Sequence, residues 1–310
     1  ILRRDLVLKV LFDADKIDKQ EYLTSINTPL NVADASSLAS GKHPAFMDQV
    51  ARELNTILAD PNIRQSGLKV FTTLDINAQR RAEKALSSRV ANLAKQRNVT
   101  TLQGAMVISD IRSGGIRTII GDAVVDTKGF NRALDARRSI GSLVKPAIYY
   151  NALRDPSQYQ LASMLPDKAI VLEDQQGKKW SPQNADKQFL GEVRLLDALI
   201  NSRNLPAVKV ALDTGIDNVV ATLTALGVNE SVPALPAISL GAVNLSAIQV
   251  NQMYQTLAND GLYKPLHAVS AVLSPDNVLL WKHSNFSEQR INEQVAYLLN
   301  YALHKVTKDG

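Results

Sequence analysis

The sequence predicts an α+β fold, in which a sheet of early and late strands encloses a helical insert. Three observations indicate this class. Strand patterns occupy residues 68–74 and 105–120, helical patterns dominate from 142 to 260, and a strand pattern returns at 269–281. With 310 residues, of which 45% are hydrophobic and 21% charged, the chain has the composition of a globular protein of about two domains, or of one large domain with an appendage.

Composition excludes several kinds of site. The chain has no cysteine, which rules out disulfides, thiolate metal sites and a cysteine nucleophile. Its four histidines never occur at ligand spacing, so we expect no metal. A net charge of +5 is too small to indicate a nucleic-acid partner. No apolar run approaches the ~20 residues of a membrane span, and the start lacks a signal peptide. We therefore expect any anchoring segment to lie upstream.

The first residues predict two helices, a basic amphipathic one with an apolar stripe from Leu6 to Leu11 and a second over Asp18 to Ser25. The stripe has no evident partner within the next forty residues. Residues 31–43 are rich in Ala, Ser and Gly and are the best linker candidate. A helical stripe resumes at Pro44 and stops at Asp60-Pro61, so a folded unit is expected to begin there.

The strand-rich parts have clear boundaries. Residues 68–74 alternate like a strand, and Asp75 then caps a helix predicted from Ile76 to Val90. Residues 105–120 predict a hairpin with a Gly-Gly turn. Late in the chain a second hairpin is predicted over 269–281.

The remaining predicted elements are helices. One spans Glu192 to Ile200, another begins at Pro206, and a terminal helix spans Glu293 to Lys305. No internal repeat is present.

The candidate chemistry concentrates around Ser142 and Lys145. The two residues are three positions apart, so on a helix beginning near Ser142 their side chains share one face, and an unprotonated amine there could take the serine proton. Pro146 fits the first turn of such a helix. The Ser-x-x-Lys pattern by itself is weak, because it occurs by chance about once in a chain of this length.

A second motif, Ser202-Arg203-Asn204, lies in a turn predicted between two helices. There a hydroxyl and an amide could point to the same place, which suits proton relay and amide binding. The alternative is an ordinary helix cap by Ser202 or Asn204. Taken together, the two motifs match those of penicillin-binding proteins and class A β-lactamases, which favours the catalytic interpretation.

The wider sequence resembles the transpeptidase domain of class A, bifunctional penicillin-binding proteins. The resemblance rests on residues 131–146, 180–184 and 240–246, with 259–261 and 3–8 as further matches. It implies the penicillin-binding, serine transpeptidase (β-lactamase-like) fold. It also implies three parts: residues 1–30 as the tail of a glycosyltransferase domain, 31–66 as an inter-domain linker region, and 67–310 as a transpeptidase domain that is incomplete at its C-terminus.

The resemblance also implies a function, a peptidoglycan D,D-transpeptidase that is a penicillin target. Ser142 would attack the penultimate D-Ala carbonyl of a stem peptide, and an amine of a neighbouring stem peptide would then take the acyl group. Lys145 would be the base for Ser142, Ser202 would pass a proton to the departing amine, and Asn204 would bind the donor amide and hold Lys145. No metal or organic cofactor is required.

Partners and location follow from the same resemblance. The partners would be peptidoglycan stem peptides, lipid II-derived glycan strands and β-lactam antibiotics, with an outer-membrane lipoprotein activator and division proteins as further partners. The parent protein would have a single-pass anchor in the inner membrane, upstream of this sequence, and this domain in the periplasm.

Two departures from the family pattern matter. The glycosyltransferase active-site motifs are absent, so no glycan polymerisation is expected. The family's third transpeptidase motif, Lys-Thr/Ser-Gly, is also absent. The oxyanion hole would combine the Ser142 N–H with an N–H of that third motif, so we expect these 310 residues alone to lack half of the hole.

Other functions stay open at this stage. A serine β-lactamase needs a glutamate that activates water, and Glu230, the only Glu between Asn204 and Leu240, lacks the lactamase pattern. A D,D-carboxypeptidase would use the same residues with water as acceptor, and a nonenzymatic, penicillin-sensing scaffold would bind without turnover. Basic residues near the motifs predict either a rim that attracts substrate carboxylates or a solvated surface. These are Arg137, Arg138, Lys178, Lys179 and Arg203.

Overall fold

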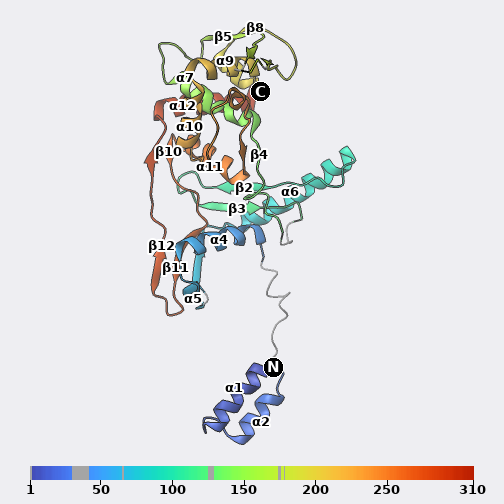
Figure 1. The fold of residues 1–310 in the computed structure, drawn as a ribbon, viewed down its shortest axis with the longest axis vertical. Coiled ribbons are helices and arrows are strands. Elements are labelled where there is room, and N and C mark those ends of the chain that lie inside the picture. Colours follow the sequence, from blue (N-terminus) through green and yellow to red (C-terminus); the bar gives the residue numbers. More distant parts are fainter. Residues whose placement is uncertain (1, 30–41, 65, 125–128, 174–175, 178) are drawn as a thin grey trace. The chain divides into compact units, whose positions relative to one another are not determined.

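The computed structural model describes residues 2–29, 42–64, 66–124, 129–173, 176–177 and 179–310. The chain divides into two compact units, Ile1–Lys42 and His43–Gly310 (Figure 1). Most of the predicted linker at 31–43 lies outside the described residues. No described helix combines the length and apolar character needed to cross a bilayer.

The first unit is a pair of helices, as predicted. They are α1 (Leu2–Asp13) and α2 (Lys19–Asn27). Asp18 begins α2, because its carboxylate accepts hydrogen bonds from two backbone N–H groups of the first turn, while Glu21 bonds back to the N–H of Asp18. This reciprocal cap satisfies donors that the start of a helix leaves unpaired.

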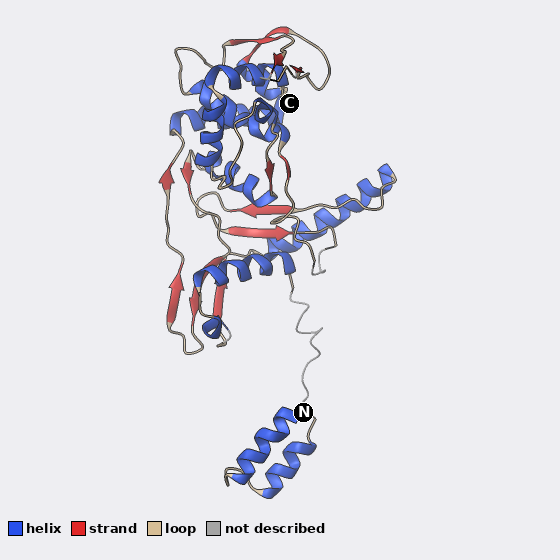
Figure 2. Cartoon of the chain, in the orientation of Figure 1, coloured by secondary structure: helices blue, strands red, loops and turns tan. Residues whose placement is uncertain are grey.

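The second unit contains a sheet of early and late strands, but of the predicted early strands only the first joins it, because the hairpin of residues 105–120 pairs by itself. Strand β1 (Lys69–Thr72) pairs antiparallel with β11 (Val269–Leu273), which pairs in turn with β12 (Leu279–Lys282) (Figure 2). The hairpin predicted over residues 269–281 is therefore confirmed. About two hundred residues separate β1 from its partner, so the helical insert lies between them in the chain.

The helix α4 (Pro44–Ile57) packs on this sheet region. Its Phe46 is fully buried in an apolar cluster with residues of β11 and of strand β3 (Ile116–Ile120). The Glu53 carboxylate accepts hydrogen bonds from the backbone N–H groups of Ala268 and Val269. The assignment of residues 31–66 as an inter-domain linker region stays a prediction, but α4 within that range packs as part of the second unit.

The early hairpin and the helix before it also form as predicted. Strand β2 (Met106–Ser109) pairs antiparallel with β3, and α6 (Ile76–Arg97) begins at its cap, Asp75. The helix runs two turns beyond the predicted end at Val90. The Gln79 side chain ties α6 to β3, because its amide bonds both the N–H and the carbonyl of Ile119.

The helical insert surrounds a buried helix, α7 (Lys145–Leu153), in which every residue is buried. Two short 3₁₀ turns, η1 (Gly141–Val144) and η2 (Pro236–Leu240), lie beside its start. A helix that is covered on all sides is the centre of a core, and the largest apolar cluster of the described chain forms around α7. The other helices of this part are α8 (Leu195–Ile200), α9 (Asn204–Thr214), α10 (Ile216–Ala225), α11 (Ala247–Ala258) and α12 (Glu293–Asp309).

Two predicted helix starts in the insert are wrong. Residues 192–194 belong to a strand, β8 (Gly191–Arg194), and the helix begins only at Leu195. The next helix begins at Asn204, two residues before the predicted Pro206. Local periodicity cannot predict either start. Residues 192–194 form a strand because they pair with the distant residues 164–166, and the next helix begins at Asn204 because Asn184, from another segment, accepts its N–H. Short strand pairs also interrupt or flank the insert: β4 (Arg138–Ser139) with β9 (Asn244–Leu245), β5 (Met164–Asp167) with β8, β6 (Leu172–Glu173) with β7 (Lys179–Trp180), and β10 (Leu262–Tyr263) with β13 (Glu288–Gln289).

Candidate active site

Ser142 lies on η1, directly before the buried helix α7. The pairing of β4 with β9 fixes this turn. The ladder of hydrogen bonds continues beyond the two strands, from Ile140 N–H to the Val243 carbonyl and from Gly141 N–H to the Gly241 carbonyl, at 2.9 and 3.2 Å. Ser142 itself is exposed. Among the described residues its hydroxyl has no hydrogen-bond partner and its backbone N–H has no acceptor. The turn therefore presents a free hydroxyl and a free donor side by side.

Glycine at position 241 is required for this arrangement. Its φ is +75°, and a Cβ there would lie 2.0 Å from the carbonyl oxygen of Gly141. No side chain fits at that distance, so the backbone of η2 can support η1 only if residue 241 is glycine.

Lys145 is the first residue of α7 and is 1% exposed. Its amine donates to three oxygens: the Ser202 carbonyl at 2.5 Å, the Ser202 hydroxyl at 3.0 Å and Asn204 Oδ1 at 2.9 Å. Three acceptors match the three donors of an ammonium group. The structure thus brings Lys145, Ser202 and Asn204 together. Ser142 lies three positions before Lys145, and no hydrogen bond joins the two side chains among the described contacts.

The surroundings of Lys145 increase the fraction of its amine that is neutral. Burial, and secondly the positive charge of Arg203, lower the pKa of Lys145 from its ordinary value near 10.5 to about 8. Roughly a tenth of the amines are then neutral at pH 7, compared with fewer than about one in a thousand for an ordinary lysine. A base whose pKa lies near the working pH is the kind that proton transfer requires.

The turn that carries Ser202 and Asn204 connects α8 to α9. Ser202 has a left-handed backbone with φ +51°, and the N–H groups of Ser202 and Arg203 bond back to the carbonyls of Leu199 and Ala198 at 3.1 and 2.8 Å. These bonds close the end of α8. The chain then continues directly into α9. As a result, the Ser202 hydroxyl and the Asn204 amide oxygen both accept hydrogen bonds from the Lys145 amine.

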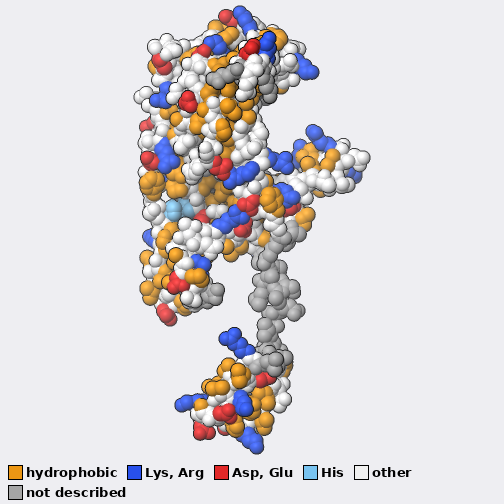
Figure 3. Space-filling model, viewed as in Figure 1, with side chains coloured by type: hydrophobic (Ala, Val, Ile, Leu, Met, Phe, Trp, Pro, Cys, Tyr) orange, Lys and Arg blue, Asp and Glu red, His pale blue; other side chains and the backbone are white. Residues whose placement is uncertain are grey.

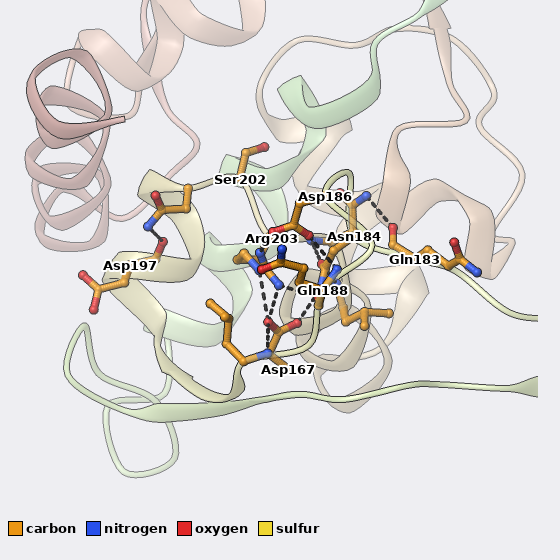
Figure 4. Close-up of polar contacts among 12 residues, drawn as sticks. Asp167, Gln183, Asn184, Asp186, Gln188, Asp197, Ser202 and Arg203 are labelled. Carbon is orange, nitrogen blue, oxygen red and sulfur yellow. Dashed lines mark hydrogen bonds and ion pairs between the residues drawn. The ribbon is translucent and has the colours of Figure 1, made fainter.

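The cap of α9 comes from a different segment. Asn184 Oδ1 accepts hydrogen bonds from the N–H groups of Asn204 and Leu205, at 2.8 and 3.2 Å (Figure 4). The Asn204 side chain donates instead to the carbonyl of Gln183 at 2.8 Å. The alternative that Ser202 or Asn204 is an ordinary helix cap is therefore wrong.

Arg203 is not part of a solvent-facing basic rim. It is 7% exposed, and its guanidinium donates to Asp167 and Asp186 (Figure 4). Arg137 pairs with Glu230, which also accepts from the Gln249 amide. Arg138 and Lys179 are exposed, and Lys178 lies outside the described residues.

Two residues of this site were missed by the sequence reasoning. Asp167 is fully buried and holds Arg203, which is 36 positions away. Asn184 belongs to a run that resembles the family, but no role was assigned to it. No local feature of the sequence marks Asp167, which is followed directly by Lys168, and nothing in the sequence indicates its partner.

An open groove lies near η1, the serine turn, but does not contain the four predicted site residues. It is bordered by residues 101–107 before and within β2, by β4 and by one side of α11, with Leu143, Val250 and Tyr254 on its walls. The Tyr254 hydroxyl donates to the carbonyl of Leu143 at 3.3 Å, so α11 contacts the serine turn directly.

Comparison with known proteins agrees with this geometry. Residues 104–310 match the family described as the penicillin binding protein transpeptidase domain. The chain belongs to this family. It is 41% identical over 309 residues to penicillin-binding protein 1B of Vibrio cholerae and 39% identical over 311 residues to the Escherichia coli protein of the same name. In each case 99% of the chain is aligned, but it covers only 40% and 37% of the relative.

Solved structures extend the similarity of this transpeptidase domain to its fold. Penicillin-binding protein 1A of Haemophilus influenzae aligns with a TM-score of 0.75 at 19% identity, over 99% of this chain and 64% of that one. PonA1 of Mycobacterium tuberculosis aligns with a TM-score of 0.69 at 25% identity, over 84% of this chain and 69% of that one. The predicted α+β, penicillin-binding fold is therefore confirmed.

Proposed function

We propose that this domain is a serine D,D-transpeptidase that cross-links peptidoglycan stem peptides and is acylated by penicillins. The observation that carries the proposal is the buried Lys145 amine, which is bonded to Ser202 and Asn204 and lies one turn after the exposed hydroxyl of Ser142. PonA1, a relative in this family, has been solved in complex with penicillin V.

In the first half-reaction, neutral Lys145 takes the hydroxyl proton of Ser142 as Ser142 Oγ bonds to the carbonyl carbon of the penultimate D-Ala. The oxyanion receives a hydrogen bond from the unpaired Ser142 N–H. The C–N bond then breaks, and the proton reaches the departing D-Ala amine from Lys145 through the Ser202 hydroxyl. The hydrogen bond between Lys145 and Ser202 supports this route.

In the second half-reaction, an amine of another stem peptide attacks the ester carbonyl carbon, the bond from that carbon to Ser142 Oγ breaks, and the proton that the amine loses returns to Ser142 Oγ. Asn204 can hold the donor peptide only in part through its amide, because Oδ1 already binds Lys145 and Nδ2 donates to Gln183. We therefore assign Asn204 mainly to holding Lys145. The second oxyanion donor is assigned to the family's third motif, which this sequence does not contain.

A labelling experiment tests the nucleophile. The full-length protein should gain one adduct on incubation with a fluorescent penicillin, and peptide mapping should place it on Ser142. Ser142→Ala should abolish the label. Ser157→Ala is the control, because the exposed Ser157 hydroxyl bonds Asp155, away from the site, and its removal should leave labelling intact. An adduct on Ser139 or Ser202 would overturn the assignment.

Product analysis separates the enzymatic alternatives. With a stem-peptide donor and an acceptor amine, a transpeptidase yields a cross-linked dimer, whereas a carboxypeptidase yields the shortened donor. Rapid release of hydrolysed penicillin would indicate a β-lactamase, and a stable adduct without turnover of stem peptides would indicate a penicillin-sensing scaffold.

The wider assignments rest on the family. We propose glycan strands derived from lipid II as the polymer that carries the stem peptides, and a location on the periplasmic side of the inner membrane with a single-pass anchor upstream. An outer-membrane lipoprotein activator and division proteins are proposed as further partners. The parts at residues 1–30, 31–66 and 67–310 are proposed as glycosyltransferase tail, linker region and transpeptidase domain.

A further inference from the structure

The residue between Ser202 and Asn204 is held more tightly than either of them. Arg203 donates four hydrogen bonds: Nε and Nη2 to Asp167 Oδ2 at 3.0 and 2.6 Å, Nη1 to Asp186 at 2.6 Å, and Nη2 to the Gln188 carbonyl at 2.7 Å (Figure 4). The side chain lies in a cage of acceptors, while the residues on either side of it, Ser202 and Asn204, bond the Lys145 amine.

The cage joins separate segments of the chain. Asp167 ends β5, whereas Asp186 and Gln188 lie in the loop between β7 and β8. Both Asp167 oxygens are occupied, since Oδ1 accepts from the Asn184 amide at 2.6 Å and Oδ2 also accepts from the N–H of Leu190 at 3.1 Å. Asn184 in turn caps α9 at Asn204. One connected network therefore holds Arg203 and the start of α9.

Such a network is a poor source of stability alone. Removing two opposite charges from water costs about as much as their attraction returns, and a well-packed apolar replacement is often as stable. Its value is geometric, because a planar guanidinium bound at several atoms has one allowed position. That rigidity matters here because Ser202 has a left-handed backbone, which a non-glycine residue adopts only at an energetic cost.

We propose that Arg203 is a positioning residue of the transpeptidase site, which holds the turn that presents Ser202 and Asn204 to Lys145 and places a permanent positive charge behind that amine. The inference rests on the proposed function. The same charge contributes to the lowered pKa of Lys145, after burial. Arg203 thus acts through Lys145 in two ways, by geometry and by charge, and touches no reacting atom itself.

The two contributions predict different effects in two variants. Arg203→Met removes both the fork of guanidinium N–H donors and the positive charge, so the maximal rate of penicillin acylation should fall about tenfold to a hundredfold. The midpoint of its pH profile should also move upward by about half a unit or more, because Lys145 then holds its proton to higher pH. Arg203→Lys keeps the charge and loses the fork, so its maximal rate should fall while its midpoint stays near that of the wild type.

The matched control is Arg194→Met. Arg194 also pairs with an aspartate, Asp197, but its side chain is 60% exposed and it has no bond to the site. Its maximal rate and midpoint should equal those of the wild type. Thermal unfolding of each variant identifies any that does not fold, and if Arg203→Met fails to fold, Arg203→Lys decides the positioning role by its maximal rate.

The outcomes separate this inference from the function on which it rests. A wild-type protein that is not acylated at Ser142 overturns both. A wild-type protein that is acylated, with folded Arg203 variants whose maximal rates match the Arg194→Met control, overturns the positioning role alone. A lower unfolding temperature in Arg203→Met with an unchanged pH midpoint would show that the charge has no influence on Lys145 and overturn that part of the proposal.

Discussion

At the scale of single residues, Lys145 has the most unusual environment in the site. An amine that is 1% exposed loses nearly all its water, and three oxygens from one turn replace it. Two of those oxygens belong to Ser202, which is itself exposed, so solvent can reach the far side of the cluster. Lys145 can therefore exchange its proton with the site while its stem remains in the core.

Replacing this lysine should separate activity from folding. Lys145→Met keeps most of the side-chain volume and removes the amine, so we expect acylation by a fluorescent penicillin to fall by about 10²- to 10⁴-fold, the usual contribution of a proton-transfer group. At pH 7 the free energy of unfolding should change little, because a desolvated charge is removed with the hydrogen bonds it made. Lys209→Met is the control, since Lys209 forms an exposed pair with Asp213. Acylation of Lys145→Met at the wild-type rate would make Lys145 structural.

The pH dependence of stability gives a second prediction for the same residue. Between its folded pKa of about 8 and its ordinary value near 10.5, Lys145 is neutral in the folded chain and protonated in the unfolded one. Because the unfolded state binds the extra proton, stability rises with pH through this window. Relative to Lys145→Met, the wild type should gain up to about 3 kcal/mol, measured by urea unfolding across the window. An unchanged difference would mean that Lys145 remains charged in the folded protein.

At the scale of elements, the site depends on helix ends that other segments complete. The start of α9 is capped by Asn184 rather than by its own residues, and η1 is supported by the glycine contact from η2. The Asn184 cap and the Gly241 contact fix the ends of the elements that carry Asn204 and Ser142. The accuracy of the site therefore depends on loops packed against those ends.

Removing the cap should weaken both stability and acylation. Asn184→Ala leaves two N–H groups of α9 without their acceptor and deprives buried Asp167 of a donor, which should cost about 1–3 kcal/mol in urea unfolding. Asn218→Ala is the control, because the exposed Asn218 amide donates to the carbonyl of Thr214 at the end of α9, far from its capped start, and it should change stability by less than about 0.5 kcal/mol. Equal effects of the two variants would contradict the capping role.

The glycine contact can be tested in the same manner. Gly241→Ala should destabilise the domain and slow acylation, because the new Cβ must push away the backbone of η1 that leads to Ser142. Gly191→Ala is the control for backbone strain alone, since Gly191 has φ +79° and open space around it, and should cost about 1 kcal/mol. Thermal unfolding and penicillin labelling measure both effects. If Gly241→Ala behaves like Gly191→Ala, the close contact does not support the serine turn.

At the scale of the whole molecule, the two units differ in how much they bury. The second unit has a large core around α7 and a smaller one around α4 and the sheet. In the first unit no residue from 3 to 29 is buried, although Phe12 and Tyr22 stack. The predicted stripe of α1 stays open, with Leu6 62% and Val10 58% exposed, and Figure 3 shows apolar side chains on the visible face of these helices.

Hydrogen exchange should reveal this difference. Helices of about ten residues without a buried face are marginal in water, so amides of α1 and α2 should exchange near the rate of unstructured peptide. Amides of α7, whose residues are all buried, should exchange slowest and serve as the internal control. Protection of Leu6 to Leu11 equal to that of α7 would show that the open stripe is covered in solution.

Sequence alone determined several local elements of this protein and the two motifs of its site. Asp75 as a cap, the hairpin over residues 106–120 and the late strand pair follow from turn residues and alternation, which act over a few positions. The Ser-x-x-Lys and Ser-x-Asn motifs were recognised in the same way, and the family that they indicated is confirmed.

Tertiary structure decided which of those residues act together. Lys145 meets Ser202 and Asn204 across more than fifty positions, and Arg203 is buried on Asp167 rather than exposed on a rim. The sequence does not show which residue a charged side chain pairs with. Whether that side chain is solvated or buried depends on segments that the fold brings beside it. The lowered pKa of Lys145 has the same origin, because desolvation and a neighbouring charge exist only after the chain has packed.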